Sequence, residues 1–158
     1  MGNAMKYASI AASLALGLAL GTSAMAAPKT IAVTPDQVKW ADNKSLPPGW
    51  QSAVLAGDLA KKGTYAVRVK IPPNSGFPAH MHPDVETITV ISGSFGIGQG
   101  TSADKSKGQM LPAGSFYRLP AHTAHFAWTE ADGAVIQVEG NGPFVVQPIK
   151  GKPAAKKS

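Results

Sequence analysis

Apolar side chains in this sequence fall in short runs in which every second position is apolar. The clearest run spans residues 64–71 and alternates an apolar face with a partly charged one. Its apolar face consists of Tyr65, Val67, Val69 and Ile71. Side chains alternate across a strand, so this spacing predicts β-strands with one buried face. We expect strands at residues 52–57, 64–71, 86–92, 94–98, 115–119, 124–129, 134–139 and 143–147.

Turn-forming residues separate the runs and indicate the fold class. Ser92-Gly93-Ser94 and Ala131-Asp132-Gly133 are two such separators, and each is expected to end one strand before the next begins. The pattern contains no long amphipathic helix, and only residues 36–40 are expected to form a helical turn. Many short strands joined by turns are typical of an all-β sandwich or barrel.

One of the expected apolar faces contains a carboxylate. Glu86 shares its side of the 86–92 strand with Ile88 and Val90. A carboxylate on an apolar face is costly unless it is paired or bound to a metal. The pattern therefore predicts a cation next to Glu86.

The first 26 residues have the features of a secretory signal peptide. Lys6 is their only charged side chain, and it precedes an apolar run at residues 10–20 and an Ala-x-Ala site that ends at Ala26. We expect cleavage before Ala27 and export to the periplasm or the medium. A membrane anchor is the alternative, but the run is shorter than the roughly 20 residues that span a bilayer. The chain has no cysteine, which excludes disulfides and a lipid-anchored cysteine.

The formal net charge of +6 comes mainly from the ends of the chain. Residues 150–158 contain four lysines, whereas residues 29–149 contain ten basic and nine acidic side chains. A nearly neutral domain lacks the basic surface typical of nucleic-acid-binding proteins. We expect a signal peptide at 1–26, an N-terminal extension at 27–49, a β-barrel at 50–149 and a disordered Lys-rich tail at 150–158.

Three of the four histidines have the spacing of metal ligands. His80 and His82 are two residues apart, so they project to the same side of an extended segment, and Glu86 keeps the same parity. His125 opens a later strand, which can lie across from the first in a closed barrel. These four side chains are predicted to bind one divalent transition metal. Imidazole and carboxylate ligands suit Fe, Mn, Co, Ni, Cu and Zn alike, so the metal's identity stays open.

The residues around these ligands resemble the two motifs of the cupin superfamily. The first motif is similar to the stretch Gly76 to His82 followed by Glu86 and Gly93, and the second to Gly114 to Pro120 followed by His125. The resemblance covers about residues 50–147. It implies a small exported single-domain cupin of the conserved-barrel type, with a double-stranded β-helix (jelly-roll) that holds a metal between three histidines and a glutamate.

Three positions depart from the family pattern. Asn74 and His122 stand where the family usually has glycine, and Thr129 stands where it has asparagine. All four ligand positions are retained. We therefore expect the departures to affect turn geometry more than coordination.

Three further residues are candidates for roles beside the metal. His122 is a candidate acid/base group or fifth ligand, with a polar loop residue as the alternative interpretation. Gln137 is a candidate for orienting a ligand or a bound water, with solvent exposure as the alternative. Tyr117 is a candidate for the same orienting role if its side chain faces the cavity.

Two classes of function follow from such a site. Four protein ligands leave open positions on an octahedral metal, which favours a metal-dependent enzyme of the dioxygenase, lyase or isomerase type acting on a small oxygen-bearing molecule. The alternative is a non-catalytic module that binds or senses a small molecule, because few other acid/base groups accompany the ligands. By analogy with cupins we also expect a homodimer. Neither a nucleic-acid partner nor a transmembrane segment is expected.

Overall fold

The computed structural model describes residues 29–149 of the 158-residue chain. The expected signal peptide and the Lys-rich tail lie outside the described residues. Contacts divide the chain after Thr30, and the fold described below belongs to the unit that begins at Ile31. Within residues 29–149, no helix is long and apolar enough to cross a membrane.

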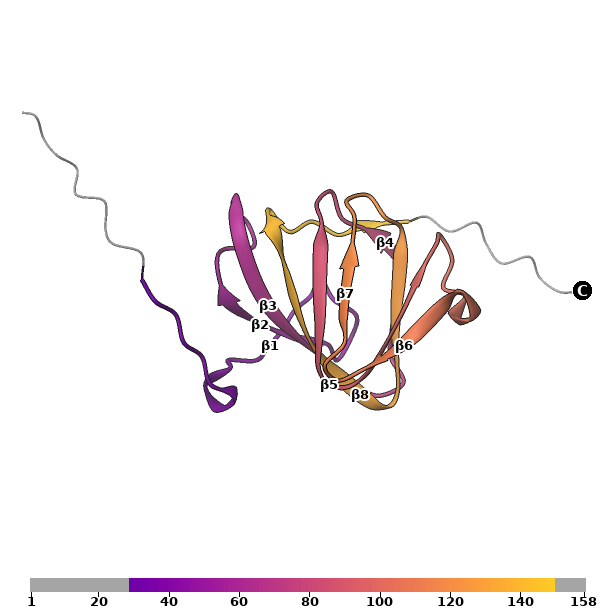
Figure 1. Cartoon of the computed structure of the whole chain (residues 1–158), viewed down its shortest axis with the longest axis horizontal. Coiled ribbons are helices and arrows are strands. Elements are labelled where there is room, and N and C mark those ends of the chain that lie inside the picture. Colours follow the sequence, from indigo (N-terminus) through magenta and orange to yellow (C-terminus); the bar gives the residue numbers. More distant parts are fainter. Residues whose placement is uncertain (1–28, 150–158) are drawn as a thin grey trace, which may run out of the picture. The chain divides into compact units, whose positions relative to one another are not determined.

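Nine strands and two single-turn 3-10 helices make up the regular structure of the described residues. The strands are β1 (Ala41–Asp42), β2 (Gln51–Ala56), β3 (Gly63–Ile71), β4 (Gly76–Met81), β5 (Glu86–Gln99), β6 (Gly108–Pro112), β7 (Phe116–Leu119), β8 (His125–Gly142) and β9 (Gln147–Pro148). The helices are η1 (Pro35–Gln37) and η2 (Lys105–Lys107). All nine strands belong to one curled antiparallel sheet (Figure 1). The all-β class and the jelly-roll barrel expected from the sequence are confirmed.

The two longest strands, β5 and β8, pair with each other along most of their length and hold the barrel together (Figure 1). Residues 125–129 of β8 pair with β4 and with the second half of β5. Residues 134–142 of β8 pair with β3, and most of them also pair with the first half of β5. Each long strand therefore contributes to two walls of the barrel.

The prediction that Gly93 and Gly133 separate strands is wrong. Each lies inside one long strand with a positive φ, +71° at Gly93 and +62° at Gly133. A side chain on Gly93 would collide with the backbone of Gly133, so the two glycines face each other where β5 and β8 bend together. The pairing register shifts on both sides of Gly93. These residues bend a strand pair instead of reversing the chain.

The predicted inner faces are confirmed. Tyr65, Val67, Val69 and Ile71 of β3 are all buried, as are Ile88 and Val90 of β5. They join a core whose largest members include Trp50, Phe95, Ile97, Leu119, Ile136 and Val138. The alternating pattern of the sequence therefore determines which side of each strand faces the interior.

Other boundaries differ from the prediction. β4 and β6 were not expected, and residues 143–147 form no strand apart from the start of β9. β4 contains Pro78 and no β-branched residue, so its sequence gives little sign of a strand; pairing with β8 and β9 supports it. The helical turn ends earlier than expected, because the backbone is already extended at Val38.

Two of the three departures from the cupin pattern, Asn74 and His122, lie at turns, whereas Thr129 lies within β8. Asn74 and His122 have φ values of +51° and +60°, and no other non-glycine among residues 29–149 has a positive φ. Thr129 is buried, and its hydroxyl donates to Pro72 O at 2.7 Å and accepts from Ser75 N at 3.2 Å. Thr129 thus fixes the turn from which β4 starts.

Removing this hydroxyl tests how much the turn contributes to stability. We expect Thr129→Val to lower the free energy of unfolding by about 2 kcal/mol, because two backbone groups lose their partner inside the protein. Urea denaturation followed by tryptophan fluorescence measures the change. Thr87→Val is the control: Thr87 is half-buried on a strand, and the change should stay within about 0.5 kcal/mol. Equal losses in both variants would contradict the role of Thr129.

Candidate metal centre

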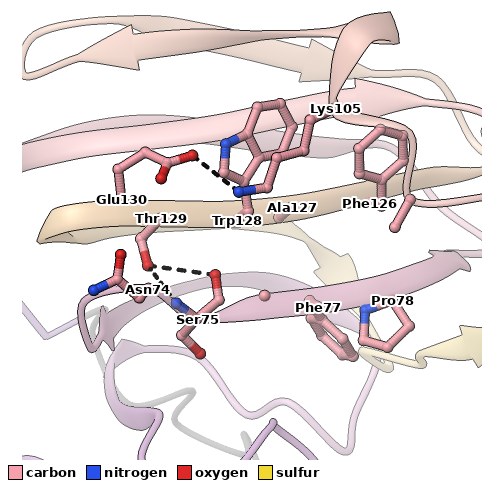
Figure 2. Close-up of a pocket in the computed structure, with 12 residues that line it drawn as sticks. Asn74, Ser75, Phe77, Pro78, Lys105, Phe126, Ala127, Trp128, Thr129 and Glu130 are labelled. Carbon is pink, nitrogen blue, oxygen red and sulfur yellow. Dashed lines mark hydrogen bonds and ion pairs between the residues drawn. The ribbon is translucent and has the colours of Figure 1, made fainter.

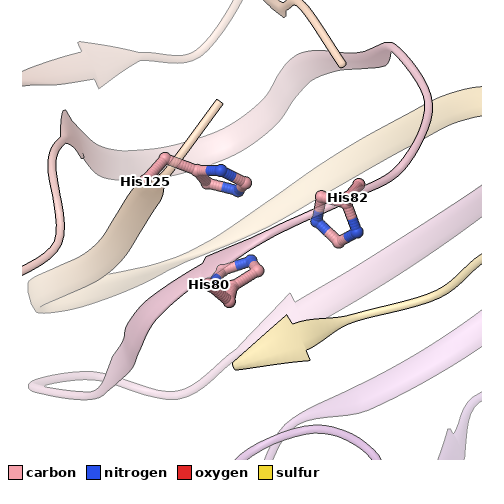
Figure 3. A group of neighbouring side chains, drawn as sticks. All are labelled: His80, His82 and His125. Carbon is pink, nitrogen blue, oxygen red and sulfur yellow. The ribbon is translucent and has the colours of Figure 1, made fainter. Parts of the chain in front are cut away.

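Four buried polar side chains meet where β4, β5 and β8 come together. His80 lies near the end of β4 and His82 just beyond it, while Glu86 and His125 are the first residues of β5 and β8. His80 and His125 are register partners on adjacent strands. The four residues are at most 6% exposed. Figure 3 shows the three histidine rings turned toward a common space.

The donor atoms of this group lie close enough together for one metal ion to contact all four side chains. One ring nitrogen from each histidine lies within 4.8 Å of the others. Glu86 Oε1 is 3.6 Å from His82 Nε2, and Glu86 Oε2 is 3.3 Å from His125 Nε2. A single ion among these atoms would contact nitrogen and oxygen donors at once. The structure therefore brings together all four residues that the sequence predicted as ligands.

Backbone carbonyls hold the far side of each imidazole ring. His80 Nδ1 lies 2.8 Å from Pro78 O, His82 Nδ1 2.8 Å from Val145 O, and His125 Nδ1 2.9 Å from Thr123 O. A carbonyl oxygen only accepts, so each Nδ1 must carry the proton. The Nε2 lone pairs are then free and point into the cluster, which is the arrangement that metal-binding histidines require.

Two atoms at the centre of the cluster have no hydrogen-bond partner among residues 29–149. His82 Nε2 and Glu86 Oε2 are buried and make no hydrogen bond. Burying an unsatisfied polar atom costs about 1–3 kcal/mol, and more for a charged one. A divalent cation would satisfy both atoms together. The residues present therefore fit a metal ion on the basis of their own geometry.

The protonation states of the cluster suit cation binding. Burial, reinforced by the neighbouring His125, lowers the pKa of His80 to about 4, so its ring is neutral at pH 7. Burial alone would raise the pKa of Glu86, but His125 and the other two histidines outweigh it and hold that pKa below its ordinary value. An ionised carboxylate beside a neutral imidazole is the form that binds a metal.

A small apolar cavity, here called the metal chamber, surrounds the four side chains. Its volume is about 50 Å³. Phe77 stacks on His80 with ring centroids 4.1 Å apart, and Phe144 stacks on His82 at 5.0 Å. The remaining wall is apolar and consists of Leu46, Trp50, Val69, Ile88, Phe95, Ile97, Ile136 and Val138. Such walls exclude water and strengthen electrostatic interactions at the ligands.

Comparison with protein families identifies the relatives of this chain. Residues 28–144 match the model of the ChrR cupin-like domain, which is most of the chain. The chain belongs to the ChrR cupin-like family. The cupin superfamily expected from the sequence motifs is thereby confirmed. No curated protein matches this cupin significantly.

Several solved structures share the fold of this cupin at low sequence identity. KdgF from Halomonas sp. is 23% identical with a TM-score of 0.56, and the match covers 73% of this chain and 96% of KdgF. The polyketide cyclase RemF from Streptomyces resistomycificus is 17% identical with a TM-score of 0.63, covering 79% of this chain and 89% of RemF. An RmlC-like cupin from Shewanella frigidimarina is 17% identical with a TM-score of 0.56, covering 72% and 91%. These likenesses concern the fold alone.

The structure does not bring the other candidate residues to the metal chamber of the cupin. His122 is exposed in a turn, where its backbone N–H donates to His82 O at 2.8 Å. Gln137 lies on the opposite face of β8 from the core residues Ile136 and Val138, and bonds Arg68 and Glu139. Neither His122 nor Gln137 therefore lies where its side chain could act on a ligand in the metal chamber.

Tyr117 is likewise away from the chamber wall. It is half-buried against the core, and its hydroxyl accepts a hydrogen bond from Gln99 at 3.1 Å. The groups that do orient the histidines are backbone carbonyls, which sequence reasoning missed. A carbonyl carries no signature in the sequence, although Pro78 and Thr123 both stand two residues before the histidine that they orient.

A second cavity of about 440 Å³ is lined mainly by residues of β4 and β8 and by the turn before β4 (Figure 2). Phe126 and Trp128, which alternate with His125 and Ala127, form part of its wall. Lys105 and Glu130 are its only charged side chains among residues 29–149, and they pair with each other at 2.9 Å. With its two charges mutually neutralised and no histidine in its lining, this cavity is not a candidate metal site.

The low pKa of His80 predicts how the stability of the metal-free protein depends on pH. Between about pH 6.5 and pH 4 the unfolded chain binds a proton at this residue and the folded chain does not, so acidification favours unfolding. We expect the free energy of unfolding to fall by about 2 kcal/mol from pH 7 to pH 5 through His80. Denaturation in the presence of a chelator measures this change.

His80→Gln removes the titrating ring and should flatten the pH dependence in this window. The exposed His122 provides the matched control, and His122→Gln should keep the wild-type dependence. An unchanged slope in His80→Gln would show that another group is responsible.

Proposed function

We propose that His80, His82, Glu86 and His125 bind one divalent transition-metal ion, and that the protein uses it to act on a small oxygen-bearing molecule. One arrangement supports this most directly. A backbone carbonyl holds Nδ1 of each of the three rings, which leaves the Nε2 atoms facing the cluster, and a buried Glu86 oxygen there has no hydrogen-bond partner among residues 29–149. Backbone carbonyls fix the orientation of the three rings, and such fixed ligands lower the cost of assembling a metal site.

A metal-dependent enzyme is the function that we favour, with the dioxygenase type ahead of the lyase and isomerase types. A bound metal would supply a Lewis acid for a ligand oxygen or, if redox-active, a centre that activates O₂. The protein's own contribution is the dry apolar wall and the fixed orientation of the ligands. The RemF likeness adds an enzyme with the same fold, but at 17% identity it carries no reaction to this chain.

A non-catalytic binding or sensing module is the second candidate. It is favoured by the lining of the metal chamber, which among the described residues contains no titratable side chain other than the four proposed ligands. Proton transfer by a separate protein group is therefore not available inside the chamber. Any catalysis must rely on the metal and its ligands.

The metal site itself is tested by removing a ligand. We expect His82→Ala to lose equimolar metal binding while its circular dichroism spectrum stays β-rich, because the ring belongs to the cluster and not to a strand pairing. Dialysis against Co(II), Zn(II), Mn(II) or Fe(II), followed by elemental analysis, measures the stoichiometry. His122→Ala should retain the metal. Equimolar metal in His82→Ala would contradict the ligand assignment.

Oxygen consumption separates the enzyme from the binding module. The oxygenase version predicts that Fe(II)-loaded protein consumes O₂ with at least one member of a panel of small phenols and dicarbonyls, and that Fe(II)-loaded His122→Ala does so equally. An oxygen electrode measures the rate. Full occupancy by Zn(II) in protein purified from the exported fraction, with no exchangeable bound water, would rule out the oxygenase version.

Export and dimerisation remain proposals that derive from the sequence. We propose that the mature chain begins at Ala27 outside the cytoplasm, and the mass of the exported protein measures this start.

We also propose a homodimer formed through exposed apolar side chains of the sheet, since Phe116 is 63% exposed and Ile91 43% exposed. Light scattering of the wild type and of Phe116→Lys measures the dimer.

A further inference from the structure

The metal chamber adjoins a larger groove on the protein surface. This outer groove has a volume of about 480 Å³ and shares Leu46, Phe77 and Phe144 with the chamber. Its other lining residues are Asn43, Ser45, Leu59, Val145, Val146 and Pro148. The three shared side chains therefore form the partition between the two spaces.

The chamber alone is too small for most organic ligands. A single water needs about 10–15 Å³ of such volume, and ligand sites of drug-sized molecules span about 300–1,000 Å³. At about 50 Å³, the chamber holds a few atoms. A molecule that reaches the ligand cluster must therefore leave its body in the outer groove.

Charge determines which head group the chamber favours. A histidine that binds a metal through Nε2 does so as the neutral ring, so a divalent ion together with the Glu86 carboxylate would leave a net charge of +1. Among residues 29–149, no lysine, arginine or second carboxylate lines the chamber. An uncompensated charge in an apolar interior is costly, and a singly charged oxygen donor cancels it. A second negative charge on the ligand would find no partner there.

The outer groove offers mainly apolar contacts to the rest of the ligand. Leu59, Val145, Val146 and Pro148 contribute apolar walls. The amide of Asn43 is already engaged, because its Nδ2 donates to Ser52 Oγ and its Oδ1 accepts from Ser45 N. Recognition of a polar body would need free hydrogen-bonding groups, and this groove presents few.

One partition residue differs from the other two in how it is held. Phe77 and Phe144 stack on metal-ligand rings, so moving either would disturb a ligand. Leu46 lies on the loop between β1 and β2, outside every strand. Its displacement opens the partition without touching a histidine. Leu46 is therefore the side chain best placed to admit a ligand.

We propose that the metal chamber and the outer groove form one binding site for a singly charged oxygen ligand with an extended apolar body, admitted past Leu46. This inference rests on the proposed metal site and specifies the ligand class of that site. It also assigns a role to the N-terminal extension, which supplies Leu46 and Asn43.

Ligand binding to the Co(II)-loaded protein tests the inference through the visible Co(II) absorption. The probes are straight-chain carboxylates from acetate to octanoate, with octanedioate as the doubly charged match. We expect affinity to rise about three- to fourfold per CH₂ beyond butanoate, because each group enters the groove. Octanedioate should bind about tenfold more weakly than octanoate, since its second charge lies in an apolar groove.

Two variants localise the effect. Val146→Asp places a charge in the groove and should weaken octanoate about tenfold while leaving acetate unchanged. Val54→Asp is the matched control, because Val54 is exposed and not part of the groove; it should bind both ligands like the wild type. Leu46→Ala should accelerate octanoate association severalfold in stopped-flow measurements.

The outcomes separate this inference from the proposed function. Equimolar Co(II) with no dependence of affinity on chain length, or equal binding of octanedioate and octanoate, would overturn the ligand class and leave the metal site standing. Unchanged association in Leu46→Ala would overturn its admitting role. Failure of the wild type to bind Co(II) would remove the metal site itself.

Discussion

Three imidazole rings and one carboxylate share the interior of an apolar barrel, and their inward-facing lone pairs have to be accommodated there. In the part of the chain that the structure describes, Glu86 Oε2 and His82 Nε2 have no hydrogen-bond partner, and both residues are buried. The surrounding structure supports this arrangement. β5 and β8 begin at two of the four groups, β4 ends at the others, and backbone carbonyls fix all three rings from behind. The buried polar atoms without a hydrogen-bond partner are concentrated at one point in the barrel. Such atoms are rare in folded proteins and are typical of a ligand-binding site.

The proposed ligand residues could be identified from the sequence because they follow local rules. His80 and His82 share parity along an extended segment, and Glu86 stands on a face that is otherwise apolar, so the sequence places the three together. The inner faces of β3 and β5 follow from the same alternation. The bends at Gly93 and Gly133 could not be predicted, because a glycine in a turn-like context looks the same whether it reverses one strand or bends a pair. Only the pairing of β5 with β8 decides between these outcomes.

The orienting groups and the chamber walls were beyond prediction for a related reason. Val145 O reaches His82 across 63 residues, and a main-chain carbonyl has the same chemistry at every position. Leu46 and Phe144 meet beside the chamber from opposite ends of the domain. His122 illustrates the reverse case: the sequence left a chemical role and a polar loop residue both open, and the structure places it in a turn with a φ of +60°, as the loop interpretation expects. A departure from a family glycine is better interpreted through backbone geometry than through the side chain that replaces it.

The bond between His82 and Val145 also has a consequence for how the protein is built during synthesis. The three other ligands are oriented or placed by neighbours in their own part of the chain, but His82 obtains its orienting carbonyl only after residue 145 has been made and has crossed the barrel end. Residues up to Val145 must therefore be made before the proposed ligand set is in its final arrangement. A translation product that stops before residue 145 would contain all four proposed ligand residues but would lack the carbonyl that orients His82.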